Sequence, residues 1–448
     1  MSLALSDPKS LLSDLIDTCL KAGASDADAS LSVGEGISVE VREGKLESIE
    51  RSEAQSVSLR CFFGQQQAHV SGSDIAPDAL TTLAERCVAM ARAVPEDPYC
   101  GLAPAEDLAT DLPVIDLTGD PEPSAQALEA EAIEAEAAAM AVDHVTNTSS
   151  CGNSWNRSRT WLAASNGFTA EKERGSTSLG LAVIAEKDGE MERDYEVRTV
   201  RRLEDRPAPG EIGRIAGERA AARLAPQKVK TQTAAVIYDR RVSASLIATF
   251  LGAISGTSVA RGVSFLKDSL GQQVFASGIN IVDDPFRARG LGSRVHDGEG
   301  RAVSRQNLIE GGVLSNWLLN GASARQLGLA PNGYASGGFG TPPGVGASNV
   351  YLEAGMQTPD ALMKQVGRGL LVADMFGPSI NPNTGDYSVG VAGFWFEDGA
   401  IVHPVSEVTI AGDLPSMFKR LVPASDLEFR AGRDAPSILI EDMSIAGE

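Results

Sequence analysis

The chain has 448 residues, with 39 Lys and Arg against 60 Asp and Glu, which leaves a net charge of −21. This length allows two or three domains, and 43% hydrophobic with 22% charged residues excludes a wholly disordered chain. The acidic balance argues against nucleic acid or an anionic membrane as a partner. No apolar run is long enough to span a bilayer, and the segment 1–21 lacks the order of a signal peptide, so we expect a cytoplasmic protein.

The first part of the chain combines helix and strand patterns. Apolar residues at helical spacing predict helices at 11–20 and 77–93, and an Ala/Glu-rich composition favours a helix at 124–142. A further helix is predicted at 209–224. Alternation of apolar and polar residues predicts strands at 27–33, 37–41, 57–63, 160–165, 168–173, 179–186 and 192–201. Gly34-Glu35-Gly36 is predicted to be a turn, and Asn166-Gly167 is typical of a two-residue hairpin loop. We therefore expect antiparallel strands beside helices.

A Pro-rich connection and a domain boundary organise the rest. Six prolines among acidic and small residues mark 95–123 as an exposed connection. Ala225-Pro226-Gln227 precedes a glycine-rich part with short predicted strands, at 234–238, 279–282, 388–397 and 437–442, and an apolar helix at 242–254. Strands and helices do not alternate strictly, which favours the α+β class over a doubly wound parallel sheet. We predict an N-terminal α+β domain, 1–225, and a C-terminal β-dominated domain with a buried helix, 226–448.

No catalytic arrangement can be recognised from the residues alone. The five cysteines form no C-x-x-C pair, Ser255 lies in only a loose version of a hydrolase motif, and the glycine-rich segment 337–346 lacks a phosphate-binding pattern. His296 stands out because Asp297 and Glu299 follow it, which leaves a functional site there open beside a structural turn. No two histidines can lie one helical turn apart, as a zinc peptidase helix requires; they are His69, His144, His296 and His403.

The second half resembles the TldD/PmbA family, specifically its PmbA (TldE) branch. No single motif is diagnostic, but the order of the pieces is specific, and a weaker likeness extends through the first half. The matching runs are 282–285 (VDDP), 297–300 (DGEG), 307–314 (NLIEGGVL), 322–331 (ASARQLGLAP), 348–352 (SNVYL), 381–388 (NPNTGDYS), 399–404 (GAIVHP) and 440–443 (IEDM).

The resemblance implies a two-domain α+β fold and proteolysis by a paired assembly. The TldD-type subunit of that family carries H-E-x-x-x-H on a helix and a cysteine near the C-terminus, which bind zinc together. In this chain the helix 242–255 takes that place, with Phe250 and Ser255 at the histidine positions and Leu251 at the glutamate position. Phe and Leu do not bind zinc, no carboxylate remains to activate water, and 429–440 lacks a cysteine. We therefore expect neither a catalytic residue nor a metal in this chain.

The leading hypothesis is a catalytically silent subunit of a cytosolic metalloprotease, paired with a zinc-binding TldD-type partner. The substrates implied are unfolded proteins or peptides, as in peptide-antibiotic maturation and antitoxin turnover. Two alternatives stay open: an independent peptidase with an unrecognised site around His296, Asp297 and Glu299, and a binding or modulator protein without a proteolytic role. A homodimer is also left open. Substrate contacts are predicted at His296, Asp297, Asn381 and Asp386.

Overall fold

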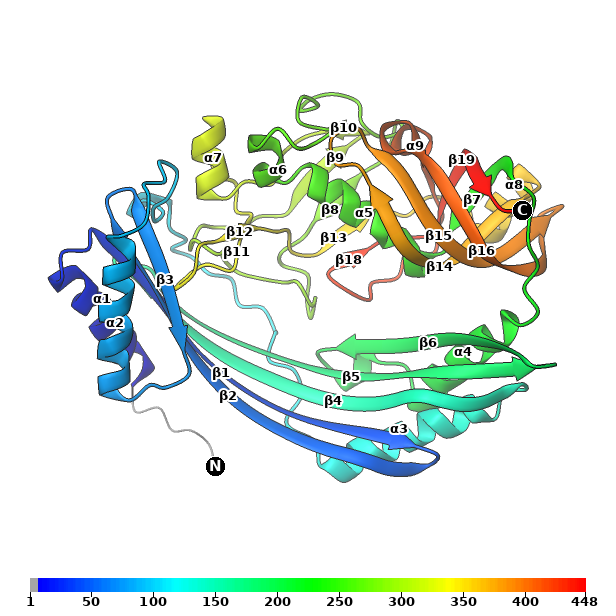
Figure 1. The fold of residues 1–448 in the computed structure, drawn as a ribbon, viewed down its shortest axis with the longest axis horizontal. Coiled ribbons are helices and arrows are strands. Elements are labelled where there is room, and N and C mark those ends of the chain that lie inside the picture. Colours follow the sequence, from blue (N-terminus) through cyan, green and yellow to red (C-terminus); the bar gives the residue numbers. More distant parts are fainter. Residues whose placement is uncertain (1–6) are drawn as a thin grey trace.

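The computed structural model describes residues 7–448, so residues 1–6 of the opening segment 1–21 lie outside the described range. The first half is built on one curved antiparallel sheet of six strands in the order β3-β2-β1-β4-β5-β6 (Figure 1). The strands are β1 (Asp26–Arg42), β2 (Lys45–Phe63), β3 (Gln66–Gly72), β4 (Val145–Ala164), β5 (Thr169–Lys187) and β6 (Glu190–Val200).

The strands of this sheet are longer than the sequence pattern predicts. The predicted turn at Gly34-Glu35-Gly36 is wrong, because β1 runs through it without a break in register. Gly36 sits where a side chain would crowd the neighbouring strand, since a Cβ there would lie 2.6 Å from Asn156 Oδ1. Gly36 therefore allows β1 and β4 to pack closely within the sheet. The predicted Asn166-Gly167 hairpin is confirmed, with Gly167 at φ 93° between β4 and β5.

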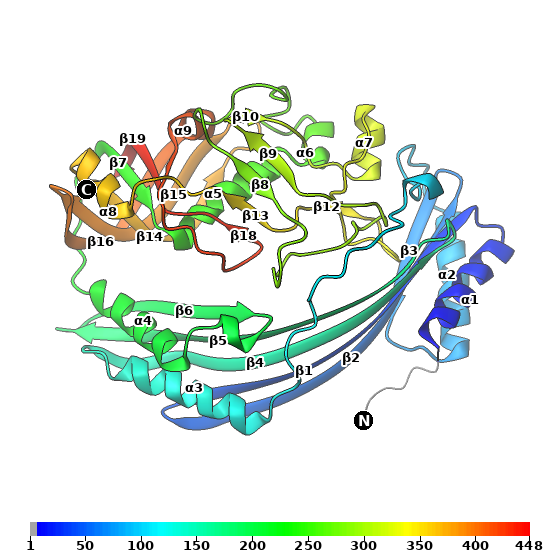
Figure 2. The same ribbon diagram turned by 180° about the vertical axis from the view of Figure 1, so that it is seen from behind.

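Four helices cover the convex face of the sheet (Figure 2). The first pair packs on one end of the sheet through a core that includes Leu12, Leu31 and Cys87. The second pair packs on the other end through Leu128, Leu179 and Ile212. The helices are α1 (Pro8–Lys21), α2 (Pro77–Ala91), α3 (Ala125–Met140) and α4 (Pro209–Ala222), which confirms the four predicted helices.

The second half contains two larger sheets and a small one, in the orders β16-β15-β14-β7-β19-β17, β10-β9-β8-β13-β18 and β11-β12. The mixture of helices and sheets confirms the α+β class. The strands are β7 (Gln232–Tyr238), β8 (Ile281–Asp283), β9 (Gln306–Glu310), β10 (Val313–Leu314), β11 (Ala335–Ser336), β12 (Gly344–Val345), β13 (Val350–Leu352), β14 (Gly369–Ile380), β15 (Asp386–Glu397), β16 (Ala400–Asp413), β17 (Val422–Pro423), β18 (Arg433–Asp434) and β19 (Ile438–Ala446). The helices are α5 (Arg240–Ala253), α6 (Gly256–Ala260), α7 (Gly321–Leu327), α8 (Pro359–Val366) and α9 (Leu414–Arg420).

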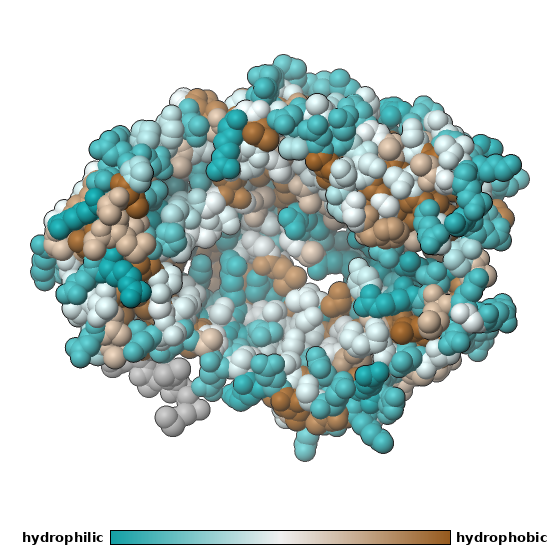
Figure 3. Space-filling model, viewed as in Figure 1, coloured by the Kyte–Doolittle hydropathy of each residue, from teal (hydrophilic) through white to brown (hydrophobic). Residues whose placement is uncertain are grey.

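The second half lies over the concave face of the first sheet, and polar contacts join the two. Arg241 of α5 donates to Asp194 of β6 across 2.7 Å, and the Gly340 amide donates to buried Asp28 of β1 across 2.7 Å. Figure 3 shows that the molecule is hollowed between the sheet and the second half. Within residues 7–448 no helix has both the length and the apolar character needed to cross a bilayer.

Candidate functional site

The sheet presents small polar side chains to this hollow. Residues of even number face it over 28–40 of β1, 48–62 of β2, 152–164 of β4 and 170–184 of β5, as the contact of Asp28 with the second half and the 3.0 Å hydrogen bond between Ser32 and Thr160 indicate. Small side chains leave space above a sheet, and their hydroxyl groups can serve as donors or acceptors. These residues are Ser30, Ser32, Gly34, Ser38, Ser52, Ser56, Ser58, Ser154, Asn156, Ser158, Thr160, Ser176 and Ser178.

Two cavities follow from this small-residue surface. One, of about 420 Å³, extends over Gly34, Asn156 and Ser158 and is bounded by Arg174 and Leu291. The other, of about 610 Å³, lies further along β1, β4 and β5 toward β6. Both volumes are in the range of small-ligand sites, which makes the concave face the principal candidate binding surface.

Basic side chains gather beside the smaller cavity at the seam, where β5 and the Pro-rich connection meet segment 290–293 of the second half. Buried Arg201 donates to the backbone carbonyls of Leu117, Gly175, Gly290 and Leu291, at 3.0–3.2 Å. Burial, together with the charge of Arg174, lowers the pKa of Arg201 to about 10. Arg201 therefore ties the Pro-rich connection and β5 to the second half.

Two further cations on β5 lie close to this seam. Arg174 donates to the Ser293 carbonyl at 2.9 Å, and its buried Nε has no hydrogen-bond partner. Lys172 lies two residues before it on the same face of the strand. Burial and, to a smaller extent, the charge of Arg174 lower the pKa of Lys172 to about 8. Within residues 7–448, no hydrogen bond or ion pair holds the Lys172 ammonium group.

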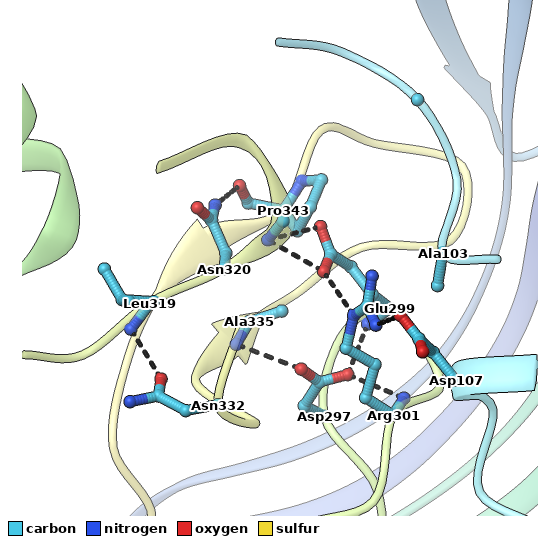
Figure 4. A network of polar contacts seen from close by, with 12 residues as sticks. Ala103, Asp107, Asp297, Glu299, Arg301, Leu319, Asn320, Asn332, Ala335 and Pro343 are labelled. Atoms are coloured by element: carbon cyan, nitrogen blue, oxygen red, sulfur yellow. Dashed lines mark hydrogen bonds and ion pairs between the residues drawn. The ribbon is translucent and has the colours of Figure 1, made fainter. Parts of the chain in front are cut away.

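The His296 region is a buried polar network in the second half, close to the end of the sheet (Figure 4). Asp297 accepts hydrogen bonds from the backbone amides of Glu299, Arg301 and Ala335 at 2.9, 2.9 and 3.3 Å. Burial, followed by repulsion from Glu299, raises the pKa of Asp297 to about 6. Its carboxylate is therefore occupied in holding the turn that contains it.

Glu299 and Arg301 extend the network to other elements. The Gly321 amide, at the start of α7, donates to both Glu299 carboxylate oxygens, at 3.1 and 2.9 Å. Arg301 contacts Glu299 and forms an ion pair with Asp107 of the Pro-rich connection (Figure 4). These contacts brace the connection against the second half, which is a structural use of both side chains.

His296 itself is enclosed by aromatic rings. Its ring lies 5.1 Å from that of Phe168 and 6.4 Å from that of Phe339, and its Nδ1 donates to the Asp297 carbonyl at 2.7 Å. Burial lowers the pKa of His296 to about 4, and the charges of Lys172, Arg174 and Arg294 add to this effect. The imidazole is therefore neutral at pH 7.

The predicted substrate-contact residues fall in two separate places. His296 and Asp297 belong to the buried network, whereas Asn381 and Asp386 are exposed at the connection between β14 and β15. The Asn381 amide donates to the Asp386 carbonyl at 2.9 Å, and the Asp386 side chain accepts from Thr384 at 2.6 Å. Asn381 and Asp386 thus order their own turn.

Helix α5 carries the positions that the family resemblance assigns to a metal site. Phe250 has no exposed surface and packs edge to face on Phe275 and Phe418, at 5.1 and 6.2 Å between ring centroids. Leu251 is 9% exposed. The predicted helix end at Ser255 is wrong, because α5 stops at Ala253 and the Ser255 hydroxyl lies 3.0 Å from that of Thr257.

The possible metal donors of residues 7–448 are dispersed. Among residues 7–448 no three His, Cys, Asp or Glu side chains are grouped closely enough to hold an ion. The position of Phe250 in a packed aromatic core leaves α5 without a ligand at that point.

The concave polar surface and the cations of β5 were missed by reasoning from sequence. The alternating serines of β1 and β2 were a usable signal, but only the sheet order shows that they share one face with Asn156, Lys172 and Arg174.

Comparison with known proteins relates most of the chain to one metallopeptidase family. Three models of the PmbA/TldA metallopeptidase match residues 27–91 (domain 1), 119–224 (central domain) and 231–447 (C-terminal domain). Metalloprotease PmbA of Escherichia coli O157:H7 is 35% identical over 98% of this chain and 97% of its own length.

Two solved structures share the fold. A modulator of DNA gyrase from Bacteroides thetaiotaomicron has a TM-score of 0.91 at 23% identity, covering 98% of this chain and 99% of that one. TldE from Thermococcus kodakarensis has a TM-score of 0.85 at 18% identity, covering 98% and 100%.

Proposed function

The chain belongs to the PmbA/TldD metallopeptidase family, and we propose that it is a subunit without a metal site, working with a zinc-binding TldD-type partner. The observation that carries this proposal is the aromatic packing of Phe250 on α5. An apolar ring without exposed surface occupies the position where the family resemblance expects a zinc ligand, and Leu251 follows where a base is expected. The scarcity of grouped metal donors in residues 7–448 supports the same assignment.

The partner supplies the metal and the activated water, and this chain supplies a wall of the substrate passage. The hollow over the concave face supports this role, because its Ser, Gly and Asn side chains leave room for an extended chain. Main-chain hydrogen bonds to a strand edge bind peptides with little sequence selectivity. The substrates proposed are unfolded proteins or peptides, including precursors of peptide antibiotics and antitoxins.

The alternative of an independent peptidase at His296 has less support. Asp297 and Glu299 are engaged by backbone amides, and Arg301 adds a contact to Glu299. A general base needs a free lone pair directed at a substrate or a water molecule. The modulator alternative agrees with the name of the Bacteroides structure, and none of the contacts described above favours it.

Metal analysis of the purified full-length chain tests the proposal. We expect well under one zinc per chain, and no cleavage of an unstructured peptide by the chain alone. About one tightly bound zinc per chain, together with chelator-sensitive cleavage, would contradict the proposal and favour an independent enzyme.

A further inference from the structure

Two cations on β5 face the hollow without an acidic partner. Even-numbered residues of this strand point toward the second half, as the hydrogen bond from Arg174 to the Ser293 carbonyl shows. Lys172 therefore points the same way, half-buried. Within the described chain its ammonium group makes no hydrogen bond or ion pair, and the buried Nε of Arg174 has no partner either.

A cation that is shielded from water and has no acidic partner destabilises the folded state, and two acidic residues lie next to Lys172 in the sequence. Buried charges in proteins are normally paired. The adjacent acids on the strand, Glu171 and Glu173, point to the opposite face and pair there with Arg159 and Arg157. The two acidic residues next to Lys172 in the sequence therefore do not neutralise it.

Neighbouring groups reinforce the positive charge. Arg294 donates to the carbonyls of Gly333, Ala335 and Gly346, at 2.8–3.2 Å, so its guanidinium is held in place by the backbone. Asp283 and Asp297 act on Arg294 through their charges, but within residues 7–448 neither forms an ion pair with it, and Asp297 has its carboxylate occupied. His296 is uncharged at pH 7, so it neither adds to nor offsets the positive charge of Lys172 and Arg174.

We propose that Lys172 and Arg174 form an anion subsite in the hollow that binds a carboxylate of an extended peptide. The two side chains are two residues apart on one strand face, roughly 7 Å along the strand, which suits one or two carboxylates of a chain lying across the sheet. Arg174 also bounds the 420 Å³ cavity, so the subsite opens onto the small-residue surface. A polyanion such as nucleic acid is disfavoured, because the net charge of −21 repels it.

This inference rests on the proposed handling of peptide substrates, and binding to the full-length chain tests it without any cleavage. The probes are a fluorescein-labelled unstructured peptide with glutamates near a free C-terminus, the same peptide amidated, and a version with glutamine for glutamate. Anisotropy titrations in about 150 mM salt limit long-range repulsion. Lys172→Gln is compared with Lys187→Gln, which removes the same charge from the exposed end of the same strand.

We expect Lys172→Gln to weaken binding of the acidic peptide about tenfold, as expected when one charge-assisted hydrogen bond is lost. Binding of the glutamine peptide should not change, Lys187→Gln should behave as wild type, and Lys172→Arg should retain binding. If only amidation weakens binding to the wild-type chain, the subsite binds the C-terminal carboxylate of the peptide. If only the glutamine substitutions weaken binding, the subsite binds the glutamate side chains. Lys172→Gln should also unfold at the same or a higher temperature, because it removes an unpaired cation.

Equal binding of the acidic peptide by wild type and Lys172→Gln would overturn the subsite but leave the proposed function standing. Absence of binding of every peptide to the wild-type chain would also overturn the subsite. In that case the metal analysis and the activity of the paired subunits would still decide the proposed function separately.

Discussion

Phe250 makes α5 a buried structural helix. Its ring, without exposed surface, forms one aromatic cluster with Phe275 and Phe418. Replacing it by histidine would place a polar ring among apolar ones, where its nitrogens would lack partners. The apolar sequence of this helix predicts that it is buried, and the packing of Phe250 confirms that prediction. The metal-site alignment of 250, 251 and 255 stays a prediction.

The double variant Phe250→His, Leu251→Glu tests this interpretation. We expect a loss of roughly 3–5 kcal/mol in the free energy of unfolding, from the lost ring contacts and a desolvated carboxyl group. We expect no gain of zinc-dependent peptide cleavage, because the third ligand and its supporting groups are absent. Urea unfolding and zinc titration measure both effects. A variant that binds zinc tightly without loss of stability would contradict the packing argument.

The buried His296 predicts a pH effect with a definite sign. Its pKa of about 4 in the folded state lies below the usual value of 6.5, so the unfolded chain binds a proton first as the pH falls. His296 therefore lowers stability progressively from pH 6.5 to pH 4. Asp297, whose folded pKa is about 6, has the opposite effect, since the folded chain takes up its proton first.

The variant His296→Gln isolates this effect. The stability difference between variant and wild type, measured by urea unfolding, should shift in favour of the variant by roughly 2–3 kcal/mol between pH 7 and pH 4. Taking the difference between the two proteins removes the contribution of Asp297 and of other carboxyl groups common to both. A constant difference across this pH range would show that His296 titrates normally.

At the scale of elements, two helices on the convex face approach each other through a glycine. Gly213 of α4 lies so close to α3 that a Cβ would fall 1.9 Å from the Ala135 carbonyl oxygen, and a backbone atom has little freedom to move away. Gly213→Ala should therefore cost at least about 2 kcal/mol, although alanine favours helix. Gly252→Ala in α5 is the control, since no atom lies within 4 Å, and it should gain about 0.5–1 kcal/mol. Thermal unfolding compares the two; equal effects would contradict the close approach.

The same elements show what could be predicted from sequence. Helices α1 and α2 followed from apolar spacing, α3 from its Ala/Glu-rich composition, and the β4–β5 hairpin from Asn166-Gly167. The long strand β1 did not, because the two glycines at 34 and 36 have the composition of a turn, and only the approach of Asn156 shows why the strand needs a glycine at 36. Helices α7, α8 and α9 were not predicted, because segments of seven or eight residues are too short for the apolar spacing to repeat.

The candidate site was predictable only in part. His296 and Asp297 were singled out by the charged residues around them in the sequence. In the structure both are buried, and the Asp297 carboxylate accepts hydrogen bonds from backbone amides. Lys172 carried no signal, because its lack of a partner depends on the registration of β5 with β4 and on the second half above it. A family resemblance, by contrast, rests on ordered short runs and was recognisable without any knowledge of contacts.

At the scale of the whole molecule, a curved sheet and a second half enclose a hollow (Figure 3). All six strands of the first sheet precede residue 225, and the strands of the other sheets follow residue 226. We accordingly propose 1–225 and 226–448 as the two domains, joined by contacts such as those of Arg201. A framework of this size that lacks metal ligands on α5 is best explained by pairing, and we propose that the second half carries most of the contact with the TldD-type partner.

Co-expression with a TldD-type subunit tests the central claim most directly, through sizing of the complex and a chelator-sensitive peptide-cleavage assay. The account predicts a stable complex with an interface well above roughly 1,000 Å², and cleavage only when both subunits are present. Self-association of the isolated chain as a two-fold dimer is compatible with this result if the partner displaces it. A partner that cleaves as fast alone as in the mixture, with no complex at micromolar concentration, would contradict the account.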